Sequence, residues 1–284
     1  MDRRRFLELS VGALGAAGIV SCGRRGGDEA LGPVLSEEVA FAFDNAGNRY
    51  EMDFNDYEVR RVAPDGAIVW SQGNVSNPAL FNYPTSMEID ADGTIYVADR
   101  GNGEVERLSP AGLPLGTFAT ELESAEDISL DRARRELYVS GGIEHTVRVY
   151  SAAGLALRRI GEFGTAGAGL NGPRGVALSP SRELHVVDSG NARVQVYGLD
   201  GSYRRSYGDT GAEELRLRMP RDIVFDSAGR PLISDPVAMR LARYSSSGAL
   251  VEHVELKDDQ GRIGVPLYLA IAPTDRLYAT VIFA

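Results

Sequence analysis

Residues 173–208 read PRGVALSPSRELHVVDSGNARVQVYGLDGSYRRSYG, and this stretch predicts four short antiparallel strands. The expected strands cover residues 175–178, 183–188, 193–197 and 203–207, and apolar residues alternate with polar ones along them. Turn-forming residues separate the strands, and Gly201 before the last strand supplies the positive φ that a tight hairpin requires. The stretch therefore predicts one small four-stranded sheet.

The same unit recurs about six times along the chain, with a period of roughly 46 residues. One position marks the period, at the end of the second strand of each unit: Asp53, Asp99, Gly141, Asp188, Asp235 and Thr280. A glycine follows thirteen positions after each of the first five of these: Gly66, Gly112, Gly154, Gly201 and Gly248. Four-stranded units of this length predict a β-propeller. We expect an all-β chain in which residues 39–284 form a six-bladed β-propeller.

Units two and four contain the most regular stretches, which are residues 95–102 (IYVADRGN), 173–178 (PRGVAL) and 184–197 (LHVVDSGNARVQVY). In these stretches the chain resembles the NHL-repeat family. The resemblance extends over about residues 39–284 and is weakest in unit three, where Gly141 stands in place of the recurrent aspartate. It implies a six-bladed propeller of NHL type.

The sixth unit contains only its first two expected strands, at residues 269–271 and 277–279. We therefore expect five complete four-stranded blades and a sixth blade with inner strands only. The alternative is a truncated gene product. An uncovered strand edge invites pairing with another chain, so self-association through blade six is expected as a further role.

The N-terminus has the pattern of an export signal. Arg3-Arg4-x-Phe6-Leu7 is similar to a twin-arginine motif, and an apolar run from Leu9 to Val20 follows it. That run is shorter than the roughly 20 residues a membrane-spanning helix needs. Cys22 stands where a bacterial lipobox has its lipidated cysteine, and the alternative is a plain cleaved signal with an incidental cysteine. We expect a signal peptide over residues 1–21 and a lipid-anchored linker over residues 22–38, in a bacterial envelope lipoprotein.

Charge and cysteine usage narrow the function. The chain carries a net charge of −10, and residues 1–21 contribute +1, which leaves −11 for the remainder. Nucleic acids are therefore unfavourable partners, because phosphates require a basic surface. Cys22 is the only cysteine, so disulfides and cysteine-bound zinc are excluded from the propeller.

The connectivity of a propeller brings the start of each inner strand and the end of each second strand to one face. We place Asp127, Arg174, Arg221 and Asp222 at the mouth of the central channel on this face, with Asp53, Asp99, Asp188 and Asp235 around them. These side chains could hold a small ligand or a cation. The recurrence of aspartate at one repeat position favours another role, in which its carboxylate caps the neighbouring loop.

The three histidines argue against a zinc site. We expect His185 to fill a packing position and His253 to lie on an outer strand, so only His145 can reach the channel face. Propeller lyases that hold zinc with several histidines are therefore a poor match, and no cofactor is expected. The leading hypothesis is a lipid-anchored binding module for a protein, a peptide or an envelope glycan. The alternative is a metal-dependent propeller lyase or hydrolase that uses the same mouth residues.

Overall fold

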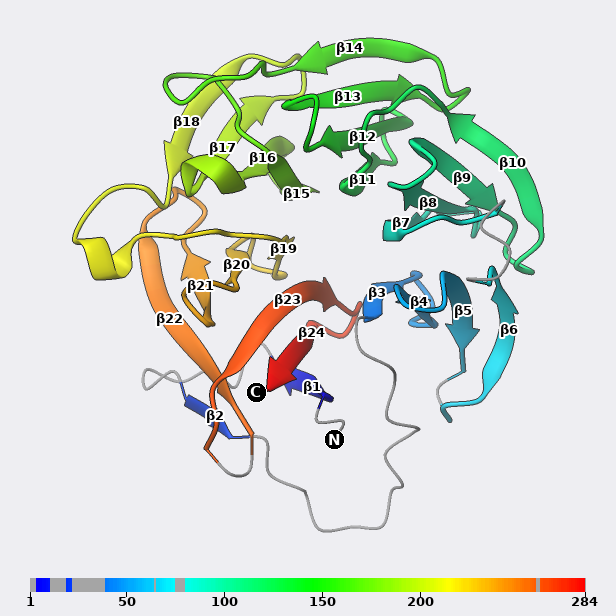
Figure 1. The fold of residues 1–284 in the computed structure, drawn as a ribbon, viewed down its shortest axis with the longest axis horizontal. Helices are drawn as coiled ribbons and strands as arrows, with labels where there is room; N and C mark the ends of the chain where they lie inside the picture. The colour runs from blue at the N-terminus through cyan, green and yellow to red at the C-terminus, as the bar shows by residue number, and fades with distance from the viewer. Residues whose placement is uncertain are drawn as a thin grey trace.

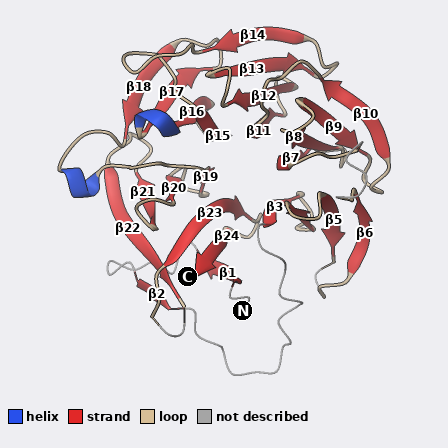
Figure 2. Ribbon diagram, viewed as in Figure 1, coloured by secondary structure: helices blue, strands red, loops and turns tan. Residues whose placement is uncertain are grey.

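The computed structural model describes residues 4–10, 19–21, 39–63, 65–74, 80–258 and 261–283. Small sheets surround a central axis, with the first strand of each repeat unit innermost (Figure 1). Within these residues nearly all of the regular structure is strand, and the two short helical turns are 3₁₀ turns, η2 (Ser189–Asn191) and η3 (Glu213–Leu215) (Figure 2). Across the described residues no helix is long and apolar enough to cross a membrane.

The chain forms five complete four-stranded blades. Blade 1 contains β3 (Val39–Phe43), β4 (Arg49–Asp53), β5 (Glu58–Val62) and β6 (Ile68–Gln72). Blade 2 contains β7 (Pro84–Ile89), β8 (Ile95–Asp99), β9 (Glu104–Leu108) and β10 (Pro114–Ala119). Blade 3 contains β11 (Asp127–Asp131), β12 (Glu136–Gly141), β13 (Thr146–Ser151) and β14 (Ala156–Ile160). Blade 4 contains β15 (Pro173–Leu178), β16 (Glu183–Asp188), β17 (Arg193–Gly198) and β18 (Tyr203–Tyr207). Blade 5 contains β19 (Ile223–Phe225), β20 (Pro231–Asp235), β21 (Arg240–Tyr244) and β22 (Leu250–Lys257).

The structure has the five complete blades that we expected, and the six-bladed propeller of the prediction is corrected to these five blades. The last two strands, β23 (Gly264–Ile271) and β24 (Arg276–Phe283), form a three-stranded sheet with β1 (Arg4–Ser10). This sheet lies between blade 5 and blade 1, where β23 runs beside β3 (Figure 1). It closes the ring without the two outer strands that a full blade would have.

The edge of β24 that we expected to be open is covered. β1 pairs antiparallel with β24, from Arg4 opposite Ile282 to Ser10 opposite Arg276. The short strand β2 (Ile19–Ser21) pairs in parallel with β22 at the edge of blade 5. An edge strand offers a row of unpaired backbone N–H and C=O groups, and a strand from the same chain satisfies them as well as a partner would. Cys22 and the expected linker over residues 22–38 lie outside the described residues.

Apolar side chains between neighbouring blades make up the core. One cluster joins Ala98 and Val105 of blade 2 to Ile128 and Leu137 of blade 3, and similar clusters join the other neighbouring sheets. At the closure of the ring, Phe43 of β3 packs against Tyr278 of β24, with ring centroids 4.7 Å apart. Each sheet therefore buries its two faces against its two neighbours.

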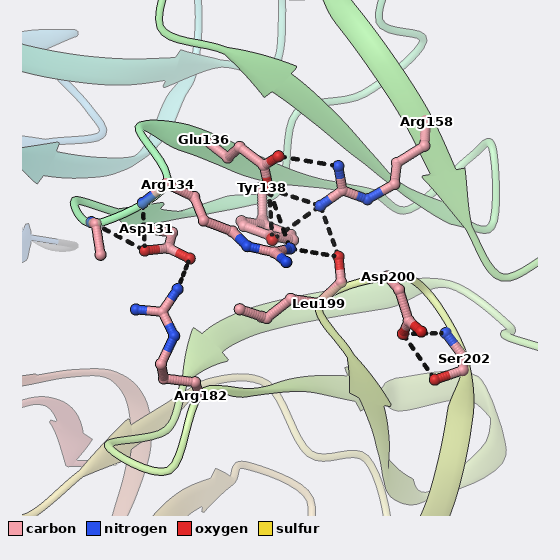
Figure 3. A network of polar contacts seen from close by, with 10 residues as sticks. Asp131, Arg134, Glu136, Tyr138, Arg158, Arg182, Leu199, Asp200 and Ser202 are labelled. Atoms are coloured by element: carbon pink, nitrogen blue, oxygen red, sulfur yellow. Dashed lines mark hydrogen bonds and ion pairs between the residues drawn. The ribbon is translucent and has the colours of Figure 1, made fainter.

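A polar network connects blade 3 to blade 4 (Figure 3). It lies on the face that carries the turns between the first and second strands and between the third and fourth strands of each blade. Arg158 donates to both carboxylate oxygens of Glu136, at 3.1 and 2.6 Å, and to the carbonyl oxygen of Leu199 at 2.6 Å. Arg182 bonds Asp131 at 2.7 Å across the same boundary. The Arg158 guanidinium lowers the pKa of Glu136, as expected for a bidentate charged pair. The bonds from Arg158 to Leu199 and from Arg182 to Asp131 connect blades 3 and 4, and the pair of Arg158 with Glu136 lies within blade 3.

Trp70 also joins two blades. Its indole nitrogen donates to the carbonyl oxygen of Pro110 at 3.2 Å, so blade 1 is linked to the turn between β9 and β10. The recurrent turn glycine of blade 2, Gly112, lies under the indole: a Cβ atom there would stand 2.6 Å from a Trp70 ring carbon. Gly66, the equivalent glycine of blade 1, has no neighbour within 4 Å of such a Cβ atom.

This difference makes a matched pair of substitutions. Both glycines have a positive φ, +80° for Gly112 and +87° for Gly66, so alanine strains both backbones alike. Gly112→Ala also forces the Trp70 ring to move, and we expect it to lower the free energy of unfolding by about 1–3 kcal/mol more than Gly66→Ala. Urea unfolding followed by Trp70 fluorescence measures this. Equal losses in the two variants would show that the indole contact contributes nothing.

Candidate functional site

The inner strands of the five blades and β23 surround a channel with a volume of about 490 Å³. Its two ends differ in chemistry because the inner strands run in the same direction along it. The strands end in apolar residues at one opening: Phe43, Leu178, Phe225 and Ile271. The other opening, here called the mouth, is mainly polar and consists of Tyr83, Ser86, Arg100, Glu126, Asp127, Arg174, Arg221, Asp222 and Tyr268. All four residues predicted for the channel, Asp127, Arg174, Arg221 and Asp222, line it.

Asp127 and Asp222 connect neighbouring inner strands. Asp127 accepts hydrogen bonds from the Ser86 hydroxyl of β7 and from the backbone N–H of Val176 on β15, the latter at 2.7 Å. Asp222 accepts from the backbone N–H of Leu269 on β23, also at 2.7 Å. Each carboxylate further accepts from the N–H of the residue that follows it. Asp127 therefore links β11 to β7 and β15, and Asp222 links the start of β19 to β23.

The two carboxylates are close enough to affect one another. Burial raises the pKa of Asp127 well above its ordinary value, and the negative charge of Asp222 raises it further. Burial likewise raises the pKa of Asp222, to about 6. The pair therefore gains its full negative charge only above the ordinary range of aspartate.

The arginines have fewer partners than the aspartates. Glu126 is the one carboxylate in contact with two of them: the Arg100 Nε atom lies 3.1 Å from it and an Nη atom of Arg174 lies 3.7 Å from it. Arg221 stacks over the Tyr268 ring at 4.3 Å and donates to the Tyr268 hydroxyl. Tyr268 in turn stacks on Phe54 at 4.6 Å, so the ring that holds Arg221 is itself fixed in place.

The recurrent aspartates bind the loops, as their repetition predicts. Asp99 accepts from the backbone N–H of Asn82 at 2.9 Å and from the Asn102 side chain at 2.9 Å. The same loop contact joins Asp188 to the N–H of Asn171 at 2.6 Å, and Asp235 to the N–H of Arg218 at 2.8 Å. Asp53 accepts from the N–H of Asn55 at 3.0 Å. Burial raises the pKa of Asp99 to about 6. None of the four lines the described channel.

The histidines take the places expected of them, except that His145 does not reach the channel. Its Nδ1 atom accepts from the backbone N–H of Gly172 at 2.8 Å, and its ring packs on Phe163 at 4.8 Å. His185 is buried against Phe225, and burial lowers its pKa to about 4. His253 lies on the outer strand β22. Within the described ranges, no three His, Cys, Asp or Glu side chains form a group that could hold a metal ion.

Five mouth residues were not predicted from the sequence: Tyr83, Ser86, Arg100, Glu126 and Tyr268. A signal for Arg100 is present, because it directly follows the recurrent Asp99, where other units have Phe54, Gly142, Ser189 or Pro236. Glu126 directly precedes Asp127 in the unit that departs most from the repeat. The contact between Tyr268 and Arg221 spans two sheets, so spacing along the chain carries no signal for it.

Comparisons with known proteins agree with the fold. The sequence model of the NHL repeat matches residues 170–197. NHL repeat-containing protein 3 of Mus musculus is 36% identical over 67 residues, which are 22% of this chain and 19% of that protein. Protein brain tumor of Drosophila melanogaster is 28% identical over 65 residues, 23% of this chain and 6% of that protein. The chain thus spans less than a quarter of the length of the curated relatives it matches.

Solved propellers are similar over most of the chain. A streptogramin B lyase structure has a TM-score of 0.66 at 9% identity, covering 98% of both chains. A catalytically inactive virginiamycin B lyase from Staphylococcus aureus with quinupristin has a TM-score of 0.64 at 13% identity, covering 88% of this chain and 83% of that one. A chain of a nidogen/laminin complex has a TM-score of 0.55 at 18% identity, covering 81% and 80%. Together with the repeat match, these likenesses support an NHL-repeat propeller. At these identities they show the fold alone.

The carboxylate pair predicts how stability depends on pH. Asp127 and Asp222 bind a proton more tightly in the folded chain than in the unfolded one, so their contribution is fully present below about pH 4. The contribution of Asp222 is lost as the pH rises through about 6, and that of Asp127 as the pH rises through its own raised pKa. Asp222→Asn removes one negative charge and therefore lowers the raised pKa of Asp127. We expect the fall in unfolding free energy between about pH 4 and pH 8 to be smaller in this variant, by about 1–3 kcal/mol. Urea unfolding at both pH values measures it, and an equal fall in wild type and variant would contradict the coupling.

Proposed function

We propose that this chain is an extracytoplasmic binding module that is anchored to the bacterial envelope by a lipid on Cys22 and binds its ligand at the channel mouth. The ligand is a protein segment, a peptide or an envelope molecule that contacts the mouth and the loops around it. The observation that carries this proposal is the contrast between the two kinds of charged residue in the mouth. The aspartates there are occupied in joining strands, whereas Arg100 and Arg174 share one carboxylate partner, Glu126, and Arg221 stacks on Tyr268.

The ring geometry suits a binding role. We propose that β23 and β24 take the place of a sixth blade, so that the ring is a six-bladed propeller of NHL type with one incomplete blade. β1 and β2 lie within the proposed signal peptide, so cleavage before Cys22 uncovers the edge of β24. The loops that lead into the first strands of blades 2, 4 and 5 are held to their blades by Asp99, Asp188 and Asp235. A mouth surrounded by anchored loops loses little conformational freedom when a ligand binds, which favours affinity. A relative of the fold in the nidogen/laminin complex supports a protein partner by analogy.

The second candidate is a metal-dependent lyase or hydrolase of the propeller type. The likeness in fold to two lyases favours it. Against it stand the position of His145 outside the channel and the engagement of Asp127 and Asp222 by backbone N–H groups. A catalytic carboxylate or metal ligand needs free lone pairs in the site, and each oxygen of both aspartates already accepts at least one hydrogen bond, which leaves fewer lone pairs for a metal ion or a substrate proton.

The anchor is tested by Cys22→Ser in the full chain. A serine cannot form the thioether of a bacterial lipoprotein, so we expect the variant to move from the membrane fraction to the soluble envelope fraction while wild type stays with membranes. Incorporation of a labelled fatty acid is measured in the same cells, with Ser21→Ala as the control that keeps the cysteine. Label on the Cys22→Ser variant, or no label on wild type, would refute the anchor.

Binding at the mouth is tested by site-specific photocrosslinking in living cells. Tyr83 at the mouth and Tyr203 on the outer strand β18 are exposed to a similar extent, 42% and 40%, so they form a matched pair. A photoreactive phenylalanine analogue at position 83 is expected to give a defined adduct, and the same analogue at position 203 to give none. Equal adducts at both positions, or none at position 83, would contradict the proposal. Stoichiometric zinc or calcium that is lost in Asp127→Asn or Asp222→Asn would favour the lyase or hydrolase instead.

A further inference from the structure

The cationic residues of the mouth come from three different blades. Arg100 follows β8 in blade 2, Arg174 lies on β15 in blade 4, and Arg221 precedes β19 in blade 5. They converge on one opening in a chain whose net charge is −10. In such an acidic protein, a group of arginines in the channel mouth is a local reversal of charge.

Most of the hydrogen-bonding capacity of these arginines is unused. Each guanidinium has five N–H donors. The side chains of Arg100 and Arg174 are each 38% exposed, and both approach Glu126, whose side chain is only 8% exposed. Glu126 can offset one of the two positive charges, and the remaining donors of both arginines face the open mouth.

Arg221 is the most constrained of the three. No carboxylate of the described residues forms an ion pair with it, and its Nε atom is buried without a hydrogen-bond partner. Its plane is held by Tyr268, which lies on Phe54. The guanidinium is thus fixed in orientation before any ligand arrives, which lowers the entropic cost of binding.

The two aspartates of the mouth limit what can bind. Asp127 and Asp222 line the same channel as the arginines and, when ionised, repel a second anionic group placed beside them. A ligand that carries one anionic end group, followed by a neutral portion or a hydrogen-bond donor, meets both conditions. Guanidinium groups bind the planar oxygens of carboxylates and the oxygens of phosphates particularly well.

We propose that the channel mouth binds the terminal oxyanion of its ligand, a carboxylate or a phosphate, with Arg221 as the principal donor and with Arg174 and Arg100 completing the site. This inference rests on the proposed function, because it names the chemical class of ligand that the mouth accepts. Tyr268 positions Arg221 and does not itself have to contact the ligand.

The test is a titration of the full chain followed by NMR of the arginine Nε–H groups. The probes are inorganic phosphate, N-acetylglycine and its uncharged analogue N-acetylglycinamide. We expect saturable shifts of Arg221 and Arg174 with at least one of the two anions and no shifts with the amide. Saturation by N-acetylglycine alone identifies a carboxylate as the source, and saturation by phosphate alone identifies a phosphate.

Two variants of Arg221 and one matched control sharpen the result. Arg221→Gln is expected to weaken binding of the anion at least tenfold, and Arg221→Lys to weaken it less, because lysine keeps the charge and loses the planar fork. Arg204→Gln, an equal change of charge at an exposed position on the outer strand β18, is expected to leave binding unchanged. Urea unfolding of all three variants confirms that they are folded.

Several outcomes would overturn the inference. Shifts that rise without saturation at arginines over the whole surface would show only nonspecific ion association. An equal loss of binding in Arg204→Gln and Arg221→Gln, or equal binding of the amide and the acid, would also refute the site. A crosslink at position 83 without oxyanion binding would refute this inference and leave the proposed function standing. Oxyanion binding without a crosslink would refute the proposed function and leave the oxyanion site standing.

Discussion

Burial of both faces of every small sheet is the constraint on which this structure depends. A sheet of four short strands cannot cover its own apolar surface, so each blade is stable only between two neighbours. The clusters that join Ala98 and Val105 of blade 2 to Ile128 and Leu137 of blade 3 are examples of this mutual cover. The ring has to close for the same reason. The sheet of β1, β24 and β23 therefore covers blade 5 and blade 1 although it lacks the outer strands of a full blade.

The channel follows from the closed ring, and its asymmetry follows from the direction of the inner strands. Apolar residues at the ends of β3, β15, β19 and β23 gather at one opening, and the charged residues at the beginnings of β11, β15 and β19 gather at the other. The aspartates of the channel also contribute to closure, because Asp127 joins β11 to β7 and β15, and Asp222 joins blade 5 to β23. Strand pairing, blade packing and the polar mouth are thus consequences of one arrangement.

The repeated features of the molecule could be predicted from the sequence. The second and fourth strands of blade 4 have the expected bounds, residues 183–188 and 203–207, because alternation and turn residues are local signals. The role of Asp99, Asp188 and Asp235 was predictable because the contact recurs in each unit. The channel positions of Asp127, Arg174, Arg221 and Asp222 followed from connectivity alone.

What could not be predicted depends on contacts between distant segments. The pairing of Arg4–Ser10 with β24 has no local signal, because any extended segment can satisfy an edge strand. The stacking of Arg221 on Tyr268 and the approach of Arg100 and Arg174 to Glu126 need the relative placement of different blades. His145 shows the opposite error: its place in the sequence allowed it to reach the channel, and its hydrogen bond to Gly172 holds it away.

Asp99 and Arg100 are adjacent in the chain and have different structural roles. The carboxylate of Asp99 is turned inward and holds the Asn82 loop, while the Arg100 guanidinium faces the mouth. The same separation holds in blade 4, where Asp188 fastens a loop and Arg174 lies in the channel. In these two blades the residue that holds a loop and the residue proposed to bind a ligand are therefore different, even when they are adjacent. Substitution of the proposed binding residues, one blade at a time, would leave the loop contacts that keep the ring intact in place.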